Sequence, residues 1–279
     1  MDKFILKISC EDEKGLVYKI TKVLYEFGLN IIVNHEFVDR EYGKFFFRAV
    51  FEAESDFEVG GVKEAIADSL PKDSYIYLDK KSLKNIAILA TKEAHCLGDL
   101  LIKFYSKEID ANIKCIISNH DNLKGLAEKF SIPYHFVSAK DIDRQAHEEL
   151  VLKELSKYEL DYIVLAKYMR ILSPKFIKEY DGKIINIHHS FLPAFIGANP
   201  YKQAHQRGVK IIGATAHFVN DNLDEGPIIS QDVVRINHEM SWEEMREAGK
   251  YVEKSVLSHA IDLVLDDRIF VYNNKTVVF

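Results

Sequence analysis

The hydrophobic and polar positions of residues 3–79 predict strands that alternate with two helices. Residues 4–8 (FILKI) have the composition of a strand, and apolar residues recur at helical spacing over 16–27. Gly28 stands where a helix commonly ends. Further strands are expected at 30–38, 44–52 and 74–78, with a second helix within 56–70. The resulting order, βαββαβ, predicts a ferredoxin-like N-terminal domain.

From about residue 84 the pattern changes to short, nearly continuous apolar runs that alternate with helices. Such runs suit parallel strands that are covered on both faces. Strands are expected at 86–90, 114–117, 162–165, 184–185, 211–219 and 226–235, and helices at 95–106, 121–130, 141–158 and 241–265. A hairpin through Asn273-Asn274 ends the chain. This order predicts a Rossmann-like α/β domain over 84–279, separated by the charged residues 79–81 from a first domain at 1–80.

Composition and charge narrow the class of protein. The 279 residues carry a formal net charge of -6, and no basic stripe suggests a nucleic-acid partner. Cys10, Cys96 and Cys115 are too widely separated for a disulfide framework, which favours reduced thiols in the cytoplasm. The N-terminus does not resemble a signal peptide, and no apolar run approaches the roughly 20 residues that span a bilayer. We therefore expect no membrane partner.

Three polar residues near strand ends are the candidates for chemistry. Asn186 and His188 are two positions apart at the end of a predicted strand, so both side chains leave the same face. Asp224 lies in a polar turn downstream. Each residue alone has an ordinary structural explanation, as a cap, a packed histidine or a turn residue. Together, an amide, an imidazole and a carboxylate could polarise a carbonyl and transfer a proton at one point.

Several sequence runs resemble a known superfamily, the folate-dependent formyltransferases and hydrolases. The resemblance is carried by residues 186–195 (NIHHSFLPAF) and 223–229 (LDEGPII), and also by 208–210 and 213–219. Residues 166–173 (AKYMRILS) resemble the loop that holds the folate pterin. The chain is most similar within this superfamily to the formyltetrahydrofolate deformylases, through 95–97, 117–120, 188–189, 197–198 before 200–201, and 274–279.

The resemblance implies hydrolysis of 10-formyltetrahydrofolate to tetrahydrofolate and formate, which would supply purine biosynthesis. It assigns catalysis to Asn186, His188 and Asp224. These roles suit the chemistry, because hydrolysis of a formyl amide passes through an oxyanion that an amide N–H can stabilise. The folate is the substrate, so no cofactor is implied. The expected substrate-binding residues are Met169, Arg170, Ile171, Leu172, His189, Gly197 and Val219.

Members of this superfamily differ in whether water or an amine accepts the formyl group. A glycinamide ribonucleotide formyltransferase binds a phosphate with a glycine-rich turn after its first strand. Residues 91–97 (TKEAHCL) contain no glycine, and Glu93 would repel a phosphate, which favours water as the acceptor. A methionyl-tRNA formyltransferase would be expected to carry a further basic RNA-binding domain, for which the chain after Asp224 is too short. Formyl transfer to a small amine and a non-catalytic folate-binding regulator remain as alternatives.

The N-terminal domain resembles an ACT domain in two turns. Asp12 and Gly15 precede the first helix and Gly28 and Asn30 follow it, at positions that face small amino-acid effectors in ACT domains. The same residues also fit a simple strand-to-helix turn and a helix C-cap. The strand at 44–52 is apolar on both faces, so its second face is expected to meet another subunit of a homo-oligomer, either a dimer or a tetramer.

The histidines do not predict a metal site. His189, His217, His205 and His238 match no zinc-binding spacing, and His217 is expected to pack beneath the active site. We therefore expect no metal ion.

A few positions depart from the pattern of the deformylases. Lys167 and Arg170 stand where arginine and glutamine would also fit, and Asn199, Ser230 and Tyr251 replace residue types that are more usual there. None of these positions belongs to the catalytic trio.

Overall fold

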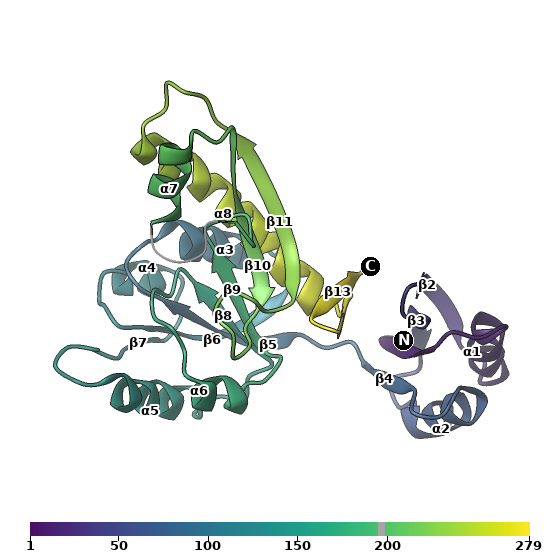
Figure 1. The fold of residues 1–279 in the computed structure, drawn as a ribbon. Helices are drawn as coiled ribbons and strands as arrows, with labels where there is room; N and C mark the ends of the chain where they lie inside the picture. The colour runs from purple at the N-terminus through teal and green to yellow at the C-terminus, as the bar shows by residue number, and fades with distance from the viewer. Residues whose placement is uncertain (195–198) are drawn as a thin grey trace. The chain divides into compact units, whose positions relative to one another are not determined.

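The computed structural model describes residues 1–194 and 199–279, and the chain divides into two compact units (Figure 1). The first unit holds Met1–Ser82 together with Val277–Phe279, and the second holds Leu83–Thr276. None of the helices in the described residues has both the length and the apolar character that a membrane span needs.

The first unit has the element order βαββαβ that the sequence predicted. Its sheet has the strand order β2-β3-β1-β4, and β1 is antiparallel to both of its neighbours. The elements are β1 (Asp2–Glu11), α1 (Leu16–Glu26), β2 (Asn30–Asp39), β3 (Lys44–Ala53), α2 (Val59–Ser69) and β4 (Tyr75–Lys80).

Strand β3 provides much of the core of this unit. Phe45, Phe47 and Phe51 alternate along the strand and belong to the core cluster that includes buried residues of α1 and α2. Phe46 and Val50 point to the other face, but they are only 1% and 6% exposed within the single chain. The open apolar face that suggested a subunit contact is therefore not found at these two positions.

The second unit is built on a mixed sheet with the strand order β11-β10-β9-β8-β5-β6-β7. Strands β5 to β9 pair in parallel, whereas β10 is antiparallel to both β9 and β11. The strands are β5 (Lys84–Ala90), β6 (Ala111–Ser118), β7 (Tyr134–Phe136), β8 (Tyr162–Ala166), β9 (Ile184–His188), β10 (Ile211–Phe218) and β11 (Ile228–Arg235). The hairpin β12 (Ile269–Tyr272) and β13 (Lys275–Val278) follows, and the last two residues of β13 belong to the first unit.

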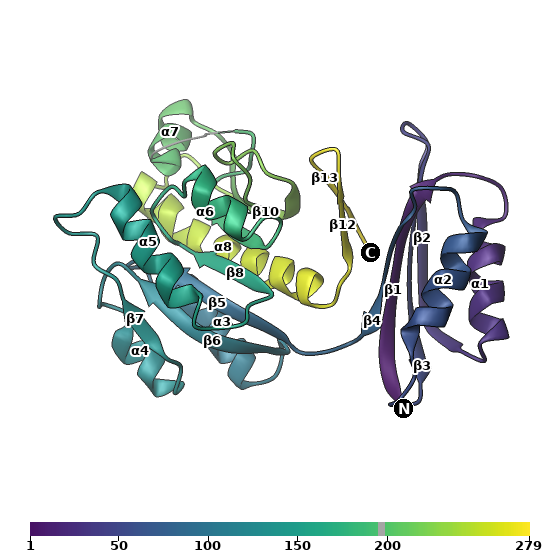
Figure 2. The same cartoon turned by 90° about the horizontal axis from the view of Figure 1, so that it is seen from below.

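Helices cover both faces of this sheet (Figures 1 and 2). Ile86 and Ile88 of β5 pack in one core cluster with α3 and α8, while Ala87 and Leu89 pack in another with α5 and α6. This alternation explains why β5 reads as a continuous apolar run. The helices are α3 (His95–Tyr105), α4 (Lys124–Lys129), α5 (Arg144–Leu155), α6 (Pro174–Glu179), α7 (Pro200–Arg207) and α8 (Trp242–Leu265). Of these elements, α6, α7 and strand β7 were not predicted from the sequence.

The chain order creates a topological switch point beside β5. The chain runs from β5 to β6 and β7 on one side and returns to β8 and β9 on the other. Because these strands are parallel, their carboxyl ends share one edge of the sheet. Ligand sites of open α/β sheets form at this edge, next to the switch point.

Candidate active site

A cavity of about 750 Å³ lies beside the carboxyl ends of β5, β8 and β9. Its lining includes Asn186, His188 and Asp224, the three residues that the sequence singled out as candidates for chemistry. The fold therefore brings together side chains that are separated in sequence, at the edge of the sheet where ligands are expected.

The amide of Asn186 is oriented by a histidine on the neighbouring strand. His217 of β10 pairs with Asn186 of β9 in the antiparallel ladder. The Nδ1 of His217 lies 2.9 Å from the Phe218 carbonyl, which can only accept, so this nitrogen carries the proton. The Nε2 of His217 is then free to accept a hydrogen bond from the Asn186 Nδ2, at 3.2 Å. This contact leaves the second N–H of the amide available to a ligand.

His188 is held by the carboxylate of Asp224. Its Nδ1 lies 3.2 Å from the Asp224 Oδ1. Its Nε2 is buried and has no hydrogen-bond partner among the described residues. A carboxylate on Nδ1 fixes both the tautomer and the ring plane of a histidine, so Nε2 is the nitrogen that His188 offers to a ligand.

Asp224 reaches the cavity from a tightly constrained turn between β10 and β11. Its backbone is left-handed, with φ of 58°, a conformation that aspartate tolerates better than most residues. Two residues later, a Cβ at Gly226 would lie 1.7 Å from the Phe218 carbonyl oxygen. Only glycine lets the turn approach β10 this closely, and this approach carries Asp224 toward His188.

The ionisable groups of the cavity are shifted from their ordinary pKa values. Burial alone would raise the pKa of Asp224, but the hydrogen bond from His188, together with the favourable electrostatic interaction with the neighbouring imidazoles, outweighs burial and lowers it. Burial, followed by the nearby charge of Lys167, lowers the pKa of His189 to about 4. At neutral pH the cavity thus contains an ionised Asp224 beside a neutral His189.

The loop after β9 is fixed to the sheet by Thr215. Its Oγ1 donates to the Ser190 carbonyl at 2.9 Å and accepts from the Leu192 amide at 3.0 Å. The side chain of Gln231 adds hydrogen bonds to Thr215 and to the Leu192 carbonyl. These contacts hold the backbone next to His189 in one place.

The loop after β8 supplies the more apolar side of the cavity. It is anchored by hydrogen bonds from the Met169 amide to Thr91 Oγ1 and from the Ser173 amide to Glu148 Oε1, both of 2.9 Å. The predicted substrate-binding residues that line the cavity are Met169, Arg170, Ile171, Leu172, His189 and Val219. Gly197, the remaining one, lies outside the described residues.

Comparisons with known proteins identify the family. Residues 84–261 match the model of the formyl transferase family. The formyltetrahydrofolate deformylase of Haemophilus influenzae is 53% identical over 278 residues, which cover 100% of this chain and 99% of the relative. The chain belongs to the formyltetrahydrofolate deformylase family. The crystal structure of a formyltetrahydrofolate deformylase from Pseudomonas syringae pv. tomato is similar with a TM-score of 0.94, at 41% identity, over 100% of this chain and 95% of that one.

The deformylase family also has structural relatives that carry another name. The structure of glycinamide ribonucleotide transformylase 1 from Symbiobacterium toebii is similar with a TM-score of 0.67, at 28% identity. The likeness covers 71% of this chain and 94% of the transformylase. One Rossmann-type scaffold therefore underlies both groups, and the choice of formyl acceptor has to come from local differences in the cavity.

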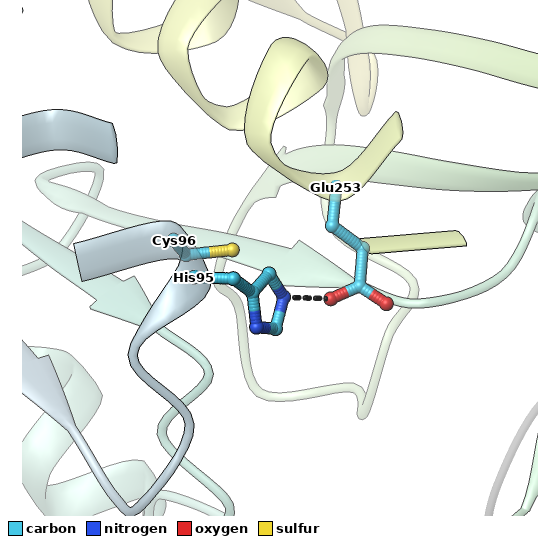
Figure 3. A group of neighbouring side chains, drawn as sticks. All are labelled: His95, Cys96 and Glu253. Carbon is cyan, nitrogen blue, oxygen red and sulfur yellow. Dashed lines mark hydrogen bonds and ion pairs between the residues drawn. The ribbon is translucent and has the colours of Figure 1, made fainter. Parts of the chain in front are cut away.

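Beside the trio, the cavity of this deformylase family member contains a second polar cluster that the sequence pattern did not reveal. Glu253 of α8 accepts hydrogen bonds from His95 Nε2 and from the Tyr201 hydroxyl, both at 2.7 Å. Figure 3 shows the His95 ring and the Glu253 carboxylate pointing toward one another. The Nζ of Lys167 lies 3.2 Å from the same carboxylate. In the sequence Glu253 looks like any polar residue of a long amphipathic helix. Nothing in its neighbourhood along the chain indicates that it is buried in the cavity wall.

The ligand-type atoms of His95, Cys96 and Glu253 lie within 4.8 Å of one another, a spacing that could hold a metal ion. The surroundings do not fit one. The carboxylate already accepts from two donors and faces the Lys167 ammonium, which would repel a divalent cation. Burial raises the pKa of the Cys96 thiol well above its ordinary value, whereas a metal ligand must be a thiolate. These residues therefore form a hydrogen-bonded ion pair rather than a metal site.

The four predicted effector residues lie in the first unit, at the two ends of α1. Gly15 precedes the helix with φ of 88°, and Gly28 follows it with φ of 71°. Asp12 and Asn30 flank these glycines and are exposed. Since the helix has 11 residues, about 16 Å of rise separates the two turns. The structure thus does not bring the four residues of one chain into a single site.

Proposed function

We propose that this protein hydrolyses 10-formyltetrahydrofolate to tetrahydrofolate and formate. The observation that carries the proposal is the convergence of the Asn186 amide, the His188 imidazole and the Asp224 carboxylate in the wall of one cavity. Membership of the deformylase family supports the same reaction.

In this proposal Asn186 stabilises the oxygen of the formyl group. Attack by water on the formyl carbon places negative charge on that oxygen. The N–H of Asn186 that is not bonded to His217 can donate to it, and one such donor is typically worth about 3–4 kcal/mol in the transition state. The neutral His217, whose pKa is lowered by burial, fixes the direction of the amide in advance.

His188 and Asp224 carry the proton in this mechanism. The attacking water must lose a proton, and the departing folate nitrogen must gain one. Asp224 is ionised and can accept a hydrogen bond from the water, while the unpartnered Nε2 of His188 can exchange a proton with the reacting groups. The pair therefore provides both a proton acceptor and a donor within one hydrogen-bonded unit.

The apolar loop after β8 is proposed to hold the folate ring. Met169 and Ile171 are largely exposed to the cavity, whereas Leu172 is buried beneath them. Apolar side chains on a fixed loop suit the faces of a ring system. This arrangement would place the ring on one side of the trio, with the formyl group directed toward Asn186.

A single assay separates this function from the alternatives. The purified full chain is incubated with 10-formyltetrahydrofolate without an acceptor, and formate is measured. Release of formate is the expected result. Consumption of the folate only in the presence of an added amine would instead support formyl transfer, and folate binding without any reaction would support a regulatory protein.

We also propose that the first unit is an ACT-like regulatory domain that binds a small amino acid. The βαββαβ order and the left-handed glycines at both ends of α1 support this proposal. Because one amino acid cannot reach from Gly15 to Gly28 within a chain, a site with both turns needs two copies, which favours a homo-oligomer. Sedimentation of the full chain as a strict monomer, with and without amino acids, would contradict it.

The three buried free cysteines favour a cytoplasmic location.

A further inference from the structure

Lys167 adopts a backbone conformation that its residue type disfavours. It directly follows β8 and has φ of 62°, in the left-handed region where a lysine side chain crowds its own backbone. Strain of this kind persists where the surroundings fix the residue, and it occurs often at functional sites. The side chain of Lys167 is also only 6% exposed, which is unusual for lysine.

The contacts of the ammonium group account for this burial. The Nζ lies 3.2 Å from the Glu253 Oε2 and 4.0 Å from the Glu93 Oε2. Glu253 is itself 1% exposed, and His95 and Tyr201 donate to it from the other directions. The carboxylate is thus surrounded by donors from α3, α7 and the loop after β8, and the lysine is the one that brings a positive charge on a long, flexible side chain.

This ion pair lies in the wall of the same cavity as the catalytic trio. Lys167, Glu253 and Glu93 line it together with Asn186 and His188. The charge of Lys167 also acts on His189, the residue directly after His188, and helps to keep its imidazole neutral. The ammonium is therefore within electrostatic reach of the reacting groups.

We propose that Lys167 is the specificity-determining residue that keeps amines out of this cavity and leaves water as the formyl acceptor. The inference rests on the proposed hydrolysis. A buried carboxylate such as Glu253 would attract the N–H groups or the ammonium form of an amine acceptor. In this chain the ammonium of Lys167 already occupies that position, fills the space beside it and repels a second cation. Water is small and neutral, so the ion pair does not exclude it.

The two possible reactions differ only in the nucleophile. In hydrolysis the water oxygen forms a bond to the formyl carbon, the bond from that carbon to the folate nitrogen breaks, and a proton passes to this nitrogen as formate leaves. In transfer an amine nitrogen takes the place of the water oxygen, and its proton passes to the folate nitrogen. Neither reaction needs an oxidant or a further reactant, so the same trio can serve both.

The test compares three variants of the full chain. Lys167→Gly removes the side chain and relieves the left-handed strain, and Lys167→Arg keeps a cation at the same place. Lys107→Gly is the matched control, because Lys107 also has a left-handed backbone, with φ of 61°, but is exposed and does not line the cavity. Each protein receives 10-formyltetrahydrofolate with and without glycinamide, and formate and N-formylglycinamide are both quantified.

We expect the wild type, Lys167→Arg and Lys107→Gly to release formate without formylating glycinamide. Lys167→Gly should raise the ratio of N-formylglycinamide to formate by roughly tenfold or more over the wild type, the scale at which a change in pocket shape alters discrimination. Formate as the only product of Lys167→Gly, in a protein that still melts cooperatively and turns over folate, would overturn the proposal.

Two further outcomes remain distinguishable. If Lys167→Gly does not turn over folate, Lys167→Met, which keeps most of the bulk without the charge, is assayed in its place, and formate as its only product would overturn a role of the charge. If the wild type releases no formate, the proposed hydrolysis itself fails, and the inference on Lys167 fails with it.

Discussion

Two carboxylates in the wall of one cavity, Asp224 and Glu253, differ in how many of their hydrogen bonds the protein itself provides. Glu253 projects from the long helix α8 and accepts hydrogen bonds from His95 and Tyr201, with the charge of Lys167 beside it. Asp224 projects from a constrained turn, with His188 Nδ1 at 3.2 Å and the Nε2 of His217 farther away, at 3.9 Å.

The difference separates a carboxylate that shapes the site from one that can react. Burial alone would raise the pKa of Glu253, but the hydrogen bond from His95 and the charge of Lys167 lower it to about 2. Because both oxygens of Glu253 already accept hydrogen bonds within the protein, this carboxylate is poorly placed to accept one from a reacting group. Asp224 has an oxygen and some exposure left for a ligand, so it can exchange hydrogen bonds during a reaction.

The most severe test of this contrast is Asp224→Asn. The amide keeps the size of the side chain but loses the charge and the proton acceptor. We expect turnover to fall by about 10²–10⁴-fold, the typical contribution of a positioned acid or base, with little change in thermal stability. Formate release in single-turnover experiments measures the effect. Glu225→Gln is the matched control, because Glu225 is the exposed neighbour in the same turn and does not line the cavity. Equal losses in both variants would refute a special role for Asp224.

Glu253→Gln should show the opposite balance, with a larger loss of stability than of catalysis. The substitution leaves the Lys167 ammonium buried beside a neutral amide, and removal of one partner of a buried ion pair typically costs about 3–5 kcal/mol. Urea denaturation measures the free energy of unfolding. The double variant Lys167→Met/Glu253→Gln should recover part of the loss, since it no longer buries an unpaired charge. A stable Glu253→Gln with turnover as low as that of Asp224→Asn would contradict the contrast.

Asn186→Ala tests whether the reactive side of the cavity includes the amide as well as Asp224. Loss of the amide removes the proposed oxyanion donor, so kcat should fall by about 10²–10³-fold while KM changes little. His217→Ala leaves the amide in place but unoriented and should give a smaller loss of kcat. Steady-state kinetics separate the two parameters. A Asn186→Ala variant that changes only KM would mean that Asn186 contributes to binding rather than to the transition state.

The same contrast explains what could be predicted from the sequence. Asn186 and His188 are neighbours on one strand, so the two-residue period places them together, and Asp224 lies in a run that resembles a family signature. Glu253, Lys167 and His95 meet only because α8, the end of β8 and the start of α3 converge in three dimensions. A residue on one face of a helix gives no sign of the partner that it will have across a sheet.

The prediction of the fold has the same limit, because elements that depend on distant contacts leave no local pattern. Short, nearly continuous apolar runs predicted β5, β6, β8 and β9, and the helical period predicted α3 and α8. The strand β7 has only three residues, and α7 has eight and begins at Pro200, shortly after a segment with Pro193 that was expected to be a loop. Elements this short are set by their tertiary contacts, such as the packing of Tyr201 against Gly249, where an added Cβ would lie 2.0 Å from the Tyr201 hydroxyl.

The smallest expected effect concerns His189, whose pKa is influenced by the charges of both Asp224 and Glu253. Its pKa is lowered from the ordinary 6.5 to about 4, first by burial and then by the charge of Lys167. The unfolded chain therefore binds a proton at His189 at a higher pH than the folded chain does. The contribution of this group to stability is present above pH 6.5 and is lost as the pH falls toward 4.

We expect His189→Asn to remove this part of the pH dependence. Between pH 7 and pH 5, a pKa of 6.5 in the unfolded state and of about 4 in the folded state corresponds to a loss of about 2 kcal/mol. Urea denaturation of wild type and variant at the two pH values should therefore show a smaller decrease for the variant, by about that amount. Parallel decreases would mean that His189 takes up a proton as readily in the folded protein as in the unfolded chain, and that the cavity does not hold it neutral.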